Sequence, residues 1–237
     1  MTFQSCDSDL INEKILRTHP QRYKGVIFDC DGVLVDSEAL SCGAWNILFE
    51  REYNIDIGTD YSHILGKTTK EVVESFFKLH SLEYTPDILP KIAAMKERIY
   101  QESAHGKLKP TPGVKEFITK LIQHNIPIIV ASSGILAKIQ FNLKETGLSD
   151  YFSQIISADG IKNGKPHPEI FLLAAERLKI PINECIVIED SVTGVSAGKA
   201  SGAFTVAITT SFPAKKLNQA DLVVKKFEEI PLDLLFR

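Results

Sequence analysis

The sequence predicts an α/β fold: a doubly wound parallel sheet with a smaller, all-helical domain inserted after the first strand. Short apolar, β-branched runs recur along the chain without alternation, which is typical of strands that are covered on both faces. Segments with helical periodicity separate these runs, as in a doubly wound sheet. One long stretch, residues 40–105, contains only helical patterns. We therefore expect a helical insertion there.

The expected elements follow one another in a regular order. Residues 1–22 lack strong periodicity, and we interpret them as an amino-terminal extension without an assigned role. A linker rich in proline and glycine, residues 106–113, ends the helical stretch. We therefore predict an α/β core of residues 23–38 and 108–237 and a helical domain of residues 39–107. The expected strands are 26–28, 126–130, 155–156, 186–188, 204–208 and 222–224, and the expected core helices are 114–123, 135–143 and 168–178.

Composition excludes several classes of protein. The 237 residues are 44% hydrophobic and 24% charged, which is ordinary for a globular protein with a sizeable core. The formal net charge of −3 argues against nucleic-acid binding, which needs a basic excess. No apolar run approaches the roughly 18 residues of a membrane-spanning helix. The acidic amino terminus does not resemble a secretory signal, so we expect a cytoplasmic protein that binds neither membranes nor nucleic acid.

The cysteines indicate no metal or disulfide framework. Cys6, Cys30, Cys42 and Cys185 are scattered and form no CxxC pair. This pattern fits a reducing compartment and argues against structural zinc. We expect Cys30 to fill the core.

Two acidic pairs follow expected strands. Asp29 and Asp31 come directly after the first strand, and in extended chain residues i and i+2 point to the same side. Glu189 and Asp190 follow the strand at 186–188. Ligands of open parallel sheets bind beyond the carboxyl ends of the strands, which is where these acids fall. Because unpaired carboxylates repel one another, a divalent cation with oxygen ligands, Mg²⁺, is the expected partner.

Two further segments complete the predicted site. Ser132 and Ser133 follow the strand at 126–130, where a hydroxyl and backbone N–H groups at a helix start suit an anion. Lys165 lies in a loop between Gly164 and Pro166. Acids, a hydroxyl, a lysine and a metal together favour phosphoryl transfer.

Four motifs carry a family resemblance. DxDGxLxDSE, a serine after an apolar strand, GKPxP and EDSxxGxxAxxxxG occur in this order, and the match covers about residues 24–207. In this respect the chain resembles the haloacid dehalogenase superfamily, within the branch that holds β-phosphoglucomutase and the sugar-phosphate and phosphoglycolate phosphatases. The helical insertion falls where that branch carries a cap domain.

The resemblance implies a role for each matched residue. Asp29 would be the nucleophile that accepts the phosphoryl group, and Asp31 the general acid and then base. Mg²⁺ would be bound by Asp29, Asp31 through its backbone carbonyl, and Asp190, with Glu189 as a further ligand.

The phosphate would be bound by a second set of residues. Ser132 would donate a hydrogen bond to it, and Lys165 would neutralise charge on the phosphate and the nucleophile. We add Gly32 and Ser133 to this set. Lys67, in the helical domain, is the expected contact with the substrate.

Two other activities stay open at this point. The mutase of this branch carries a histidine where this chain has Ser41, which cannot handle a proton in the same way. Receiver domains also accept phosphate on a strand-end aspartate, but they lack an acid equivalent to Asp31 and a large helical insertion. We therefore predict a monomeric, Mg²⁺-dependent phosphatase of a small phosphorylated metabolite, a sugar or sugar-acid phosphate.

Overall fold

The computed structural model describes residues 22–61, 64 and 68–236. Most of the expected extension, residues 1–21, lies outside this range. Contacts between Cα atoms divide the chain into two compact units, one of residues up to Val35 and from Pro110 onward, the other Asp36–Lys109. These limits lie within three residues of the predicted domain limits, whose position stays a prediction. We call the two units the core and the helical unit.

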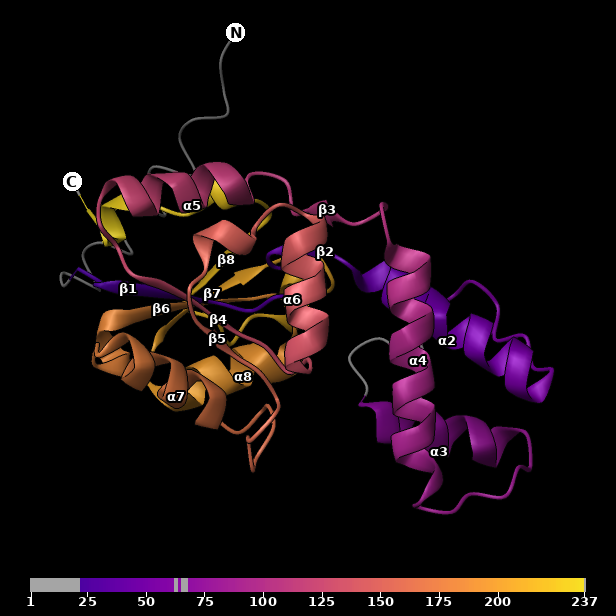
Figure 1. Cartoon of the computed structure of the whole chain (residues 1–237). Helices are drawn as coiled ribbons and strands as arrows, with labels where there is room; N and C mark the ends of the chain where they lie inside the picture. Colours follow the sequence, from indigo (N-terminus) through magenta and orange to yellow (C-terminus); the bar gives the residue numbers. More distant parts are fainter. Residues whose placement is uncertain (1–21, 62–63, 65–67, 237) are drawn as a thin grey trace, which may run out of the picture. The chain divides into compact units, whose positions relative to one another are not determined.

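The core is built on a six-stranded sheet (Figure 1). All neighbouring strands are parallel, in the order β5-β4-β1-β6-β7-β8. Strands β1, β6 and β7 are buried throughout and, apart from Thr205 and the terminal Glu189, contain no polar side chain, as the apolar runs predict. The strands are β1 (Gly25–Phe28), β4 (Ile128–Ala131), β5 (Ile155–Ile156), β6 (Cys185–Glu189), β7 (Phe204–Ile208) and β8 (Leu222–Val224).

One strand begins later than the sequence predicts. The expected strand at 126–130 starts at Ile128. The N–H of Ile126 donates to the carbonyl of Leu121 in the preceding helix, and Pro127 has no N–H to donate. Ile126 therefore completes the helix end, and Pro127 contributes its carbonyl to the sheet, where it accepts from the N–H of Val26 in β1 at 3.0 Å.

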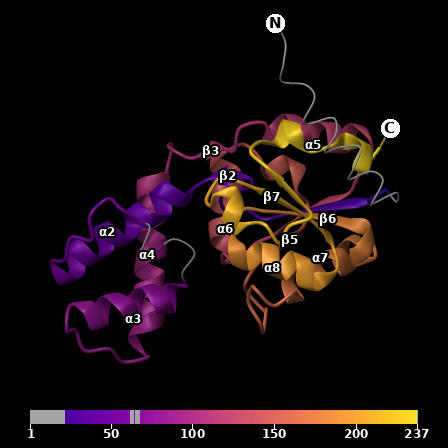
Figure 2. The same ribbon diagram turned by 180° about the vertical axis from the view of Figure 1, so that it is seen from behind.

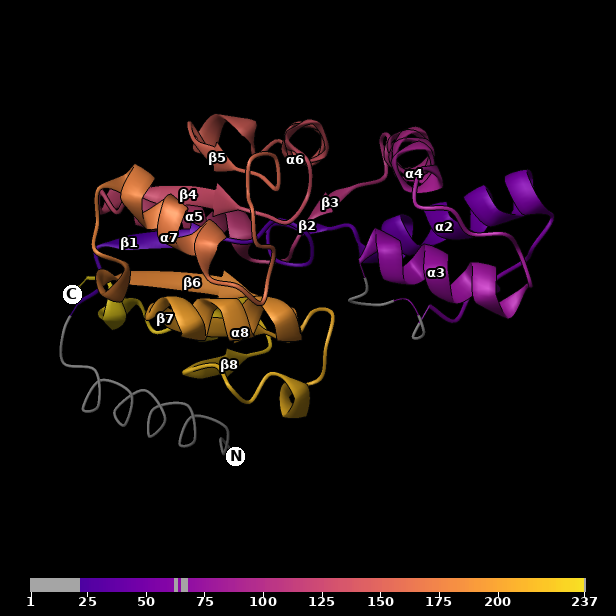
Figure 3. The ribbon, with the colours of Figure 1, turned by 90° about the horizontal axis from the view of Figure 1, so that it is seen from below.

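Helices cover both faces of the sheet. Helices α7 (Glu169–Leu178) and α8 (Val192–Ser201) lie on one face, and α5 (Val114–Gln123) lies on the other (Figures 2 and 3). The alternation of β1 explains this division, because Ile27 packs in the cluster that includes α7 whereas the Phe28 ring meets Phe117 of α5. Helix α6 (Leu136–Glu145) follows β4.

Among its described residues, the helical unit contains three helices: α2 (Glu38–Tyr53), α3 (Thr69–Leu79) and α4 (Ile88–Ala104). Aromatic side chains form much of its interior, with the ring centroids of Phe49 and Phe76 4.7 Å apart. Helix α3 begins with a capping box between Thr68 and Glu71. Ser37 is the N-cap residue of α2, but its side chain makes no capping hydrogen bond.

The remaining elements are short. The chain segments that join the two units pair as β2 (Val35–Asp36) and β3 (Lys109–Pro110), which the sequence did not predict. The 3₁₀ helices are η1 (Ser149–Tyr151), η2 (Ile182–Glu184), η3 (Ala214–Lys216), η4 (Phe227–Glu229) and η5 (Leu232–Leu234). The predicted fold class, a parallel α/β sheet with a helical insertion after the first strand, is confirmed.

Candidate active site

The acidic pairs lie at the ends of two neighbouring strands. Strand β1 pairs with β6, with Phe28 opposite Ile188, and the N–H of Asp29 extends this ladder to the carbonyl of Ile188 at 3.0 Å. Asp29 therefore lies beside the end of β6, where Glu189 and Asp190 follow. All three acids are buried, with exposed fractions of 6%, 1% and 4%. Burial of this kind requires partners for each carboxylate.

Lys165 provides the partner for two of them. Its Nζ lies 2.6 Å from Asp29 Oδ1 and 2.6 Å from Glu189 Oε1, although the three residues are far apart in sequence. The same Nζ lies 4.9 Å from the ring centroid of Phe171 on α7. The loop before α7 thus brings the predicted lysine to the predicted nucleophile.

Burial and charge act in opposite directions on this pair. Burial raises the pKa of Asp29 to about 7, and the Lys165 ammonium lowers it only in part. Burial also acts to lower the pKa of Lys165, but the carboxylates of Asp29 and Glu189 outweigh this and raise it. Lys165 is therefore protonated at neutral pH, whereas Asp29 titrates close to it.

Asp31 has a separate set of partners. Lys138 Nζ lies 2.7 Å from Asp31 Oδ2, and Asn142 Nδ2 donates to Asp31 Oδ1 at 3.1 Å. Both donors come from α6. Cys30, between the two aspartates, is fully buried, as expected.

The carboxylate of Asp190 is bound by the loop after β7. Its Oδ2 accepts a hydrogen bond from the Ser211 hydroxyl and lies 3.4 Å from Thr210 Oγ1, whose one proton is directed to the carbonyl of Gly32 at 2.6 Å. Gly32 has φ +76°, and an added Cβ would lie 1.9 Å from Asp190 Oδ2. A glycine is therefore needed for both the turn and the close approach of Asp190.

Glu189 is bound by its own backbone as well as by Lys165. Its Oε2 accepts from the N–H groups of Asp190 and Ser191, at 2.8 and 2.9 Å, and from the Ser191 hydroxyl. Protein donors therefore contact both oxygens of Glu189. Glu189 is thus a partner of Lys165, and its role as a metal ligand stays a prediction.

The predicted phosphate-binding residues lie in different surroundings. Ser132 follows β4, the other neighbour of β1, and is buried; its Oγ accepts from the N–H of Gly134 at 3.2 Å. Ser133 is exposed. Lys67 lies outside the described residues.

Sequence reasoning missed four residues that contact the predicted acids: Lys138, Asn142, Thr210 and Ser211. The spacing of Lys138 and Asn142, four residues apart in an expected helix, was a usable signal, since such residues share a face. Thr210 and Ser211 carried no comparable signal, because only the folded loop brings them to Asp190.

Comparisons with known proteins identify the family. A family model described as haloacid dehalogenase-like hydrolase matches residues 23–202. The chain belongs to this family, and the resemblance that its motifs predict is confirmed.

Its relatives differ in length and activity. Suppressor of quenching 1 of Arabidopsis thaliana is 33% identical over 84% of this chain, which spans 19% of that protein. A bifunctional riboflavin kinase/FMN phosphatase of the same plant is 32% identical over 88% of this chain, which spans 54% of that protein. β-Phosphoglucomutase of Bacillus subtilis is 34% identical over 90% of this chain and 93% of its own. Hexitol phosphatase A of Escherichia coli is 29% identical over 88% of this chain and 94% of its own.

Solved structures share the fold. A family IA hydrolase from Entamoeba histolytica superimposes with a TM-score of 0.81 at 26% identity, over 89% of this chain and 96% of its own. β-Phosphoglucomutase from Clostridium difficile superimposes with a TM-score of 0.76 at 28% identity, over 89% of this chain and 94% of its own. The shared architecture extends over nearly the whole length of both.

The charges of the site fit a divalent cation. Four carboxylates and two ammonium groups gather here, which leaves two negative charges when all are ionised. In residues 22–61, 64 and 68–236, no three His, Cys, Asp or Glu side chains form a metal-binding group. The predicted ligands are the side chains of Asp29, Asp190 and Glu189 and the backbone carbonyl of Asp31. Such hard oxygen donors suit Mg²⁺.

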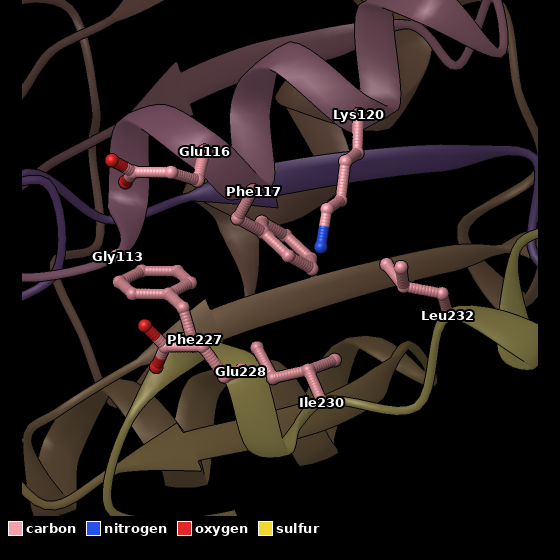
Figure 4. Close-up of a pocket in the computed structure, with 8 residues that line it drawn as sticks. All are labelled: Gly113, Glu116, Phe117, Lys120, Phe227, Glu228, Ile230 and Leu232. Carbon is pink, nitrogen blue, oxygen red and sulfur yellow. The ribbon is translucent and has the colours of Figure 1, made fainter.

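A separate hollow lies on the α5 face of the core (Figure 4). The rings of Phe117 and Phe227 turn toward each other there, with centroids 5.4 Å apart. None of the predicted site residues lines it; the lining residues are Gly113, Glu116, Phe117, Lys120, Phe227, Glu228, Ile230 and Leu232. No helix in the part of the chain that the structure describes is long and apolar enough to span a membrane.

Proposed function

We propose that this chain is a Mg²⁺-dependent phosphatase that hydrolyses a small phosphorylated metabolite, a sugar or sugar-acid phosphate, through an aspartyl-phosphate intermediate. The observation that carries the proposal is the contact of Lys165 with Asp29 and Glu189, which ties three of the four motifs together. Membership of the hydrolase family and the names of the phosphatases among the relatives support it.

The reaction would proceed in two displacements. An oxygen of Asp29 attacks phosphorus and forms a new P–O bond, while the bond from phosphorus to the substrate alcohol breaks. Asp31 gives its proton to the departing alcohol oxygen. In the second step Asp31 accepts a proton from water, the water oxygen bonds to phosphorus, and the bond to Asp29 breaks. Inorganic phosphate leaves, and both aspartates return to their starting state.

Charge neutralisation would supply most of the catalysis. Lys165 balances negative charge on Asp29 and on the entering phosphoryl group, and Ser132 donates a hydrogen bond to that group. Mg²⁺, bound by Asp29, Asp190 and the Asp31 carbonyl, would neutralise charge on the phosphoryl oxygens. We assign Glu189 to holding Lys165 in place, since protein donors already contact both of its oxygens.

The proposed substrate class rests on relatives and on composition. Hexitol phosphatase A of Escherichia coli, a relative whose name indicates a sugar-alcohol phosphate as substrate, aligns over 88% of this chain. The net charge of −3 disfavours polyanionic nucleic acid. A monomeric state, a cytoplasmic location and a substrate contact by Lys67 stay predictions of the same proposal.

A β-phosphoglucomutase activity is the second candidate, because the bacterial mutase shares 34% identity with this chain over nearly its full length. The residue at the position of the expected histidine is Ser41, whose hydroxyl accepts a hydrogen bond from Lys96 at 2.8 Å. A serine bound in this way does not replace an imidazole as a proton carrier. Hydrolysis is therefore the favoured activity.

A screen of phosphorylated metabolites separates these activities. The purified chain is incubated with each compound with and without Mg²⁺, including β-glucose 1-phosphate with an assay for glucose 6-phosphate. Release of inorganic phosphate that requires Mg²⁺ supports the phosphatase. Formation of glucose 6-phosphate supports the mutase, and stable self-phosphorylation without turnover contradicts both.

Substitution of the nucleophile tests the covalent step. Asp29→Asn removes the attacking carboxylate oxygen, so we expect turnover to fall by at least 10²-fold, on the order expected for loss of a catalytic group. Lys162→Met changes an exposed residue of the Lys165 loop and serves as the control. Full activity of Asp29→Asn in an assay of released phosphate would refute the mechanism.

A further inference from the structure

The partners of Asp31 on α6 have a chemical consequence beyond the roles already assigned. Lys138 and Asn142 are four residues apart and project from the same side of the helix, one toward each oxygen of the Asp31 carboxylate. Lys138 is 9% exposed and Asn142 is fully buried. A lysine is rarely buried unless it is paired, so this pair has a function in the folded core.

Position on the helix supports a specific role. Ile139 and Leu143, which follow Lys138 and Asn142 directly, are buried and apolar, so α6 packs without needing polar residues at positions 138 and 142. A single ion pair with Lys138 would leave the Asp31 carboxylate able to rotate about its last bond. Two donors, one on each oxygen, fix the plane of the carboxylate.

We propose that Lys138 and Asn142 are positioning residues that hold Asp31 ready for proton transfer, so that its role as acid and base is preset by the core. This inference rests on the proposed function. It extends that function by explaining a preference for water as the second acceptor, because a carboxylate fixed by α6 is available to activate water whichever alcohol has left. A carboxylate positioned only by bound substrate would favour return of the phosphoryl group to that substrate.

The two half-reactions provide the test. An aryl phosphate such as p-nitrophenyl phosphate releases a stable anion and needs little help from an acid, whereas glycerol phosphate needs a proton on its departing oxygen. In Lys138→Met and Asn142→Leu we expect nitrophenol to appear in a burst near the wild-type rate, equal to one per active site. Steady-state release should then fall about 10- to 100-fold, as should turnover of glycerol phosphate, within the range of general acid–base effects.

Two matched variants complete the experiment. Lys144→Met removes an exposed lysine of the same helix and should behave as the wild type. Lys138→Arg keeps a charged donor and should restore much of the steady-state rate. If Lys138→Met does not fold, as judged by circular dichroism, Asn142→Leu and Lys138→Arg decide the question alone.

The outcomes separate the two proposals. Equal losses in the burst and the steady state, or variants that match the wild type, overturn the positioning role while the phosphatase remains. If the wild-type chain with Mg²⁺ releases phosphate from no phosphomonoester, the proposed function fails, and the positioning role fails with it.

Discussion

At the scale of single residues, the candidate site is organised by two buried lysines with different tasks. Lys165 contacts Asp29 and Glu189 at the strand ends, and Lys138 contacts Asp31 from α6. Each aspartate of the DxD motif therefore forms an ion pair with a lysine of its own: Asp31 with Lys138 and Asp29 with Lys165. This separation places the proposed nucleophile and the proposed acid and base in different surroundings.

Ser211 offers a test of how Asp190 is oriented. Its hydroxyl donates to Asp190 Oδ2, so Ser211→Ala removes a donor that orients a proposed Mg²⁺ ligand. We expect Mg²⁺ affinity to fall about 10-fold, because residues that orient a ligand typically contribute 10- to 100-fold. Calorimetric titration with MgCl₂ measures the change.

The control for this titration is Ser153→Ala, which alters an exposed serine of the core. Unchanged affinity in Ser211→Ala, or an equal loss in the control, would show that Asp190 does not depend on this hydroxyl for metal binding.

At the scale of secondary structure, most of the core could be predicted from the sequence. The apolar runs of β1, β6 and β7 and the helical periodicity of α5 are local signals, and they survive folding because these elements are buried on the expected faces. The start of β4 could not be predicted, since it depends on a hydrogen bond from Ile126 back to the helix before it.

The site was predictable to a different degree. The motifs identify the acids and Lys165 because their spacing is fixed relative to strand ends. The donors Lys138 and Thr210 are set by where α6 and the loop after β7 come to lie, and a lysine in a helix is ordinarily read as exposed. Contacts that depend on tertiary packing, such as those of Lys138 and Thr210, therefore could not be predicted from the sequence.

Helix α8 carries a prediction of its own. Gly194 lies in its first turn, and an added Cβ would lie 1.8 Å from Glu189 Oε1. Glycine to alanine in a helix ordinarily stabilises by about 1 kcal/mol. Here the clash would displace Glu189 and disturb Lys165, so we expect Gly194→Ala to lower both the melting temperature and the turnover of a phosphomonoester.

Thr193→Ala, at the exposed neighbouring position of the same helix, is the matched control and should leave both quantities nearly unchanged. A rise in melting temperature of about 2–4 °C in Gly194→Ala, the shift that corresponds to about 1 kcal/mol in a domain of this size, would contradict the close approach of Glu189.

At the scale of the whole molecule, the buried acids link folding stability to pH. The pKa of Asp29 is raised from 3.8 to about 7, mainly by burial. A carboxyl group with a raised folded-state pKa binds its proton more tightly when folded. Its contribution to the free energy of unfolding is therefore complete below the unfolded value and is lost as pH rises through about 7. The metal-free chain should therefore lose stability as the pH rises from about 4 to about 7.

Magnesium should reverse this loss, because a cation bound to Asp29 replaces the proton. In EDTA we expect the wild-type melting temperature to fall by several degrees from pH 5.5 to pH 8, on the order of 2 kcal/mol, since pH 5.5 lies about 1.5 units below the folded-state pKa of Asp29. Saturating MgCl₂ should raise the melting temperature more at pH 8 than at pH 5.5. Asp29→Asn does not titrate, so both the pH step and the Mg²⁺ shift should shrink relative to the wild type. Comparing the two proteins by thermal denaturation cancels the titration of all other groups. If the melting temperature of the wild type falls no more between pH 5.5 and pH 8 than that of Asp29→Asn, the pH dependence does not come from Asp29.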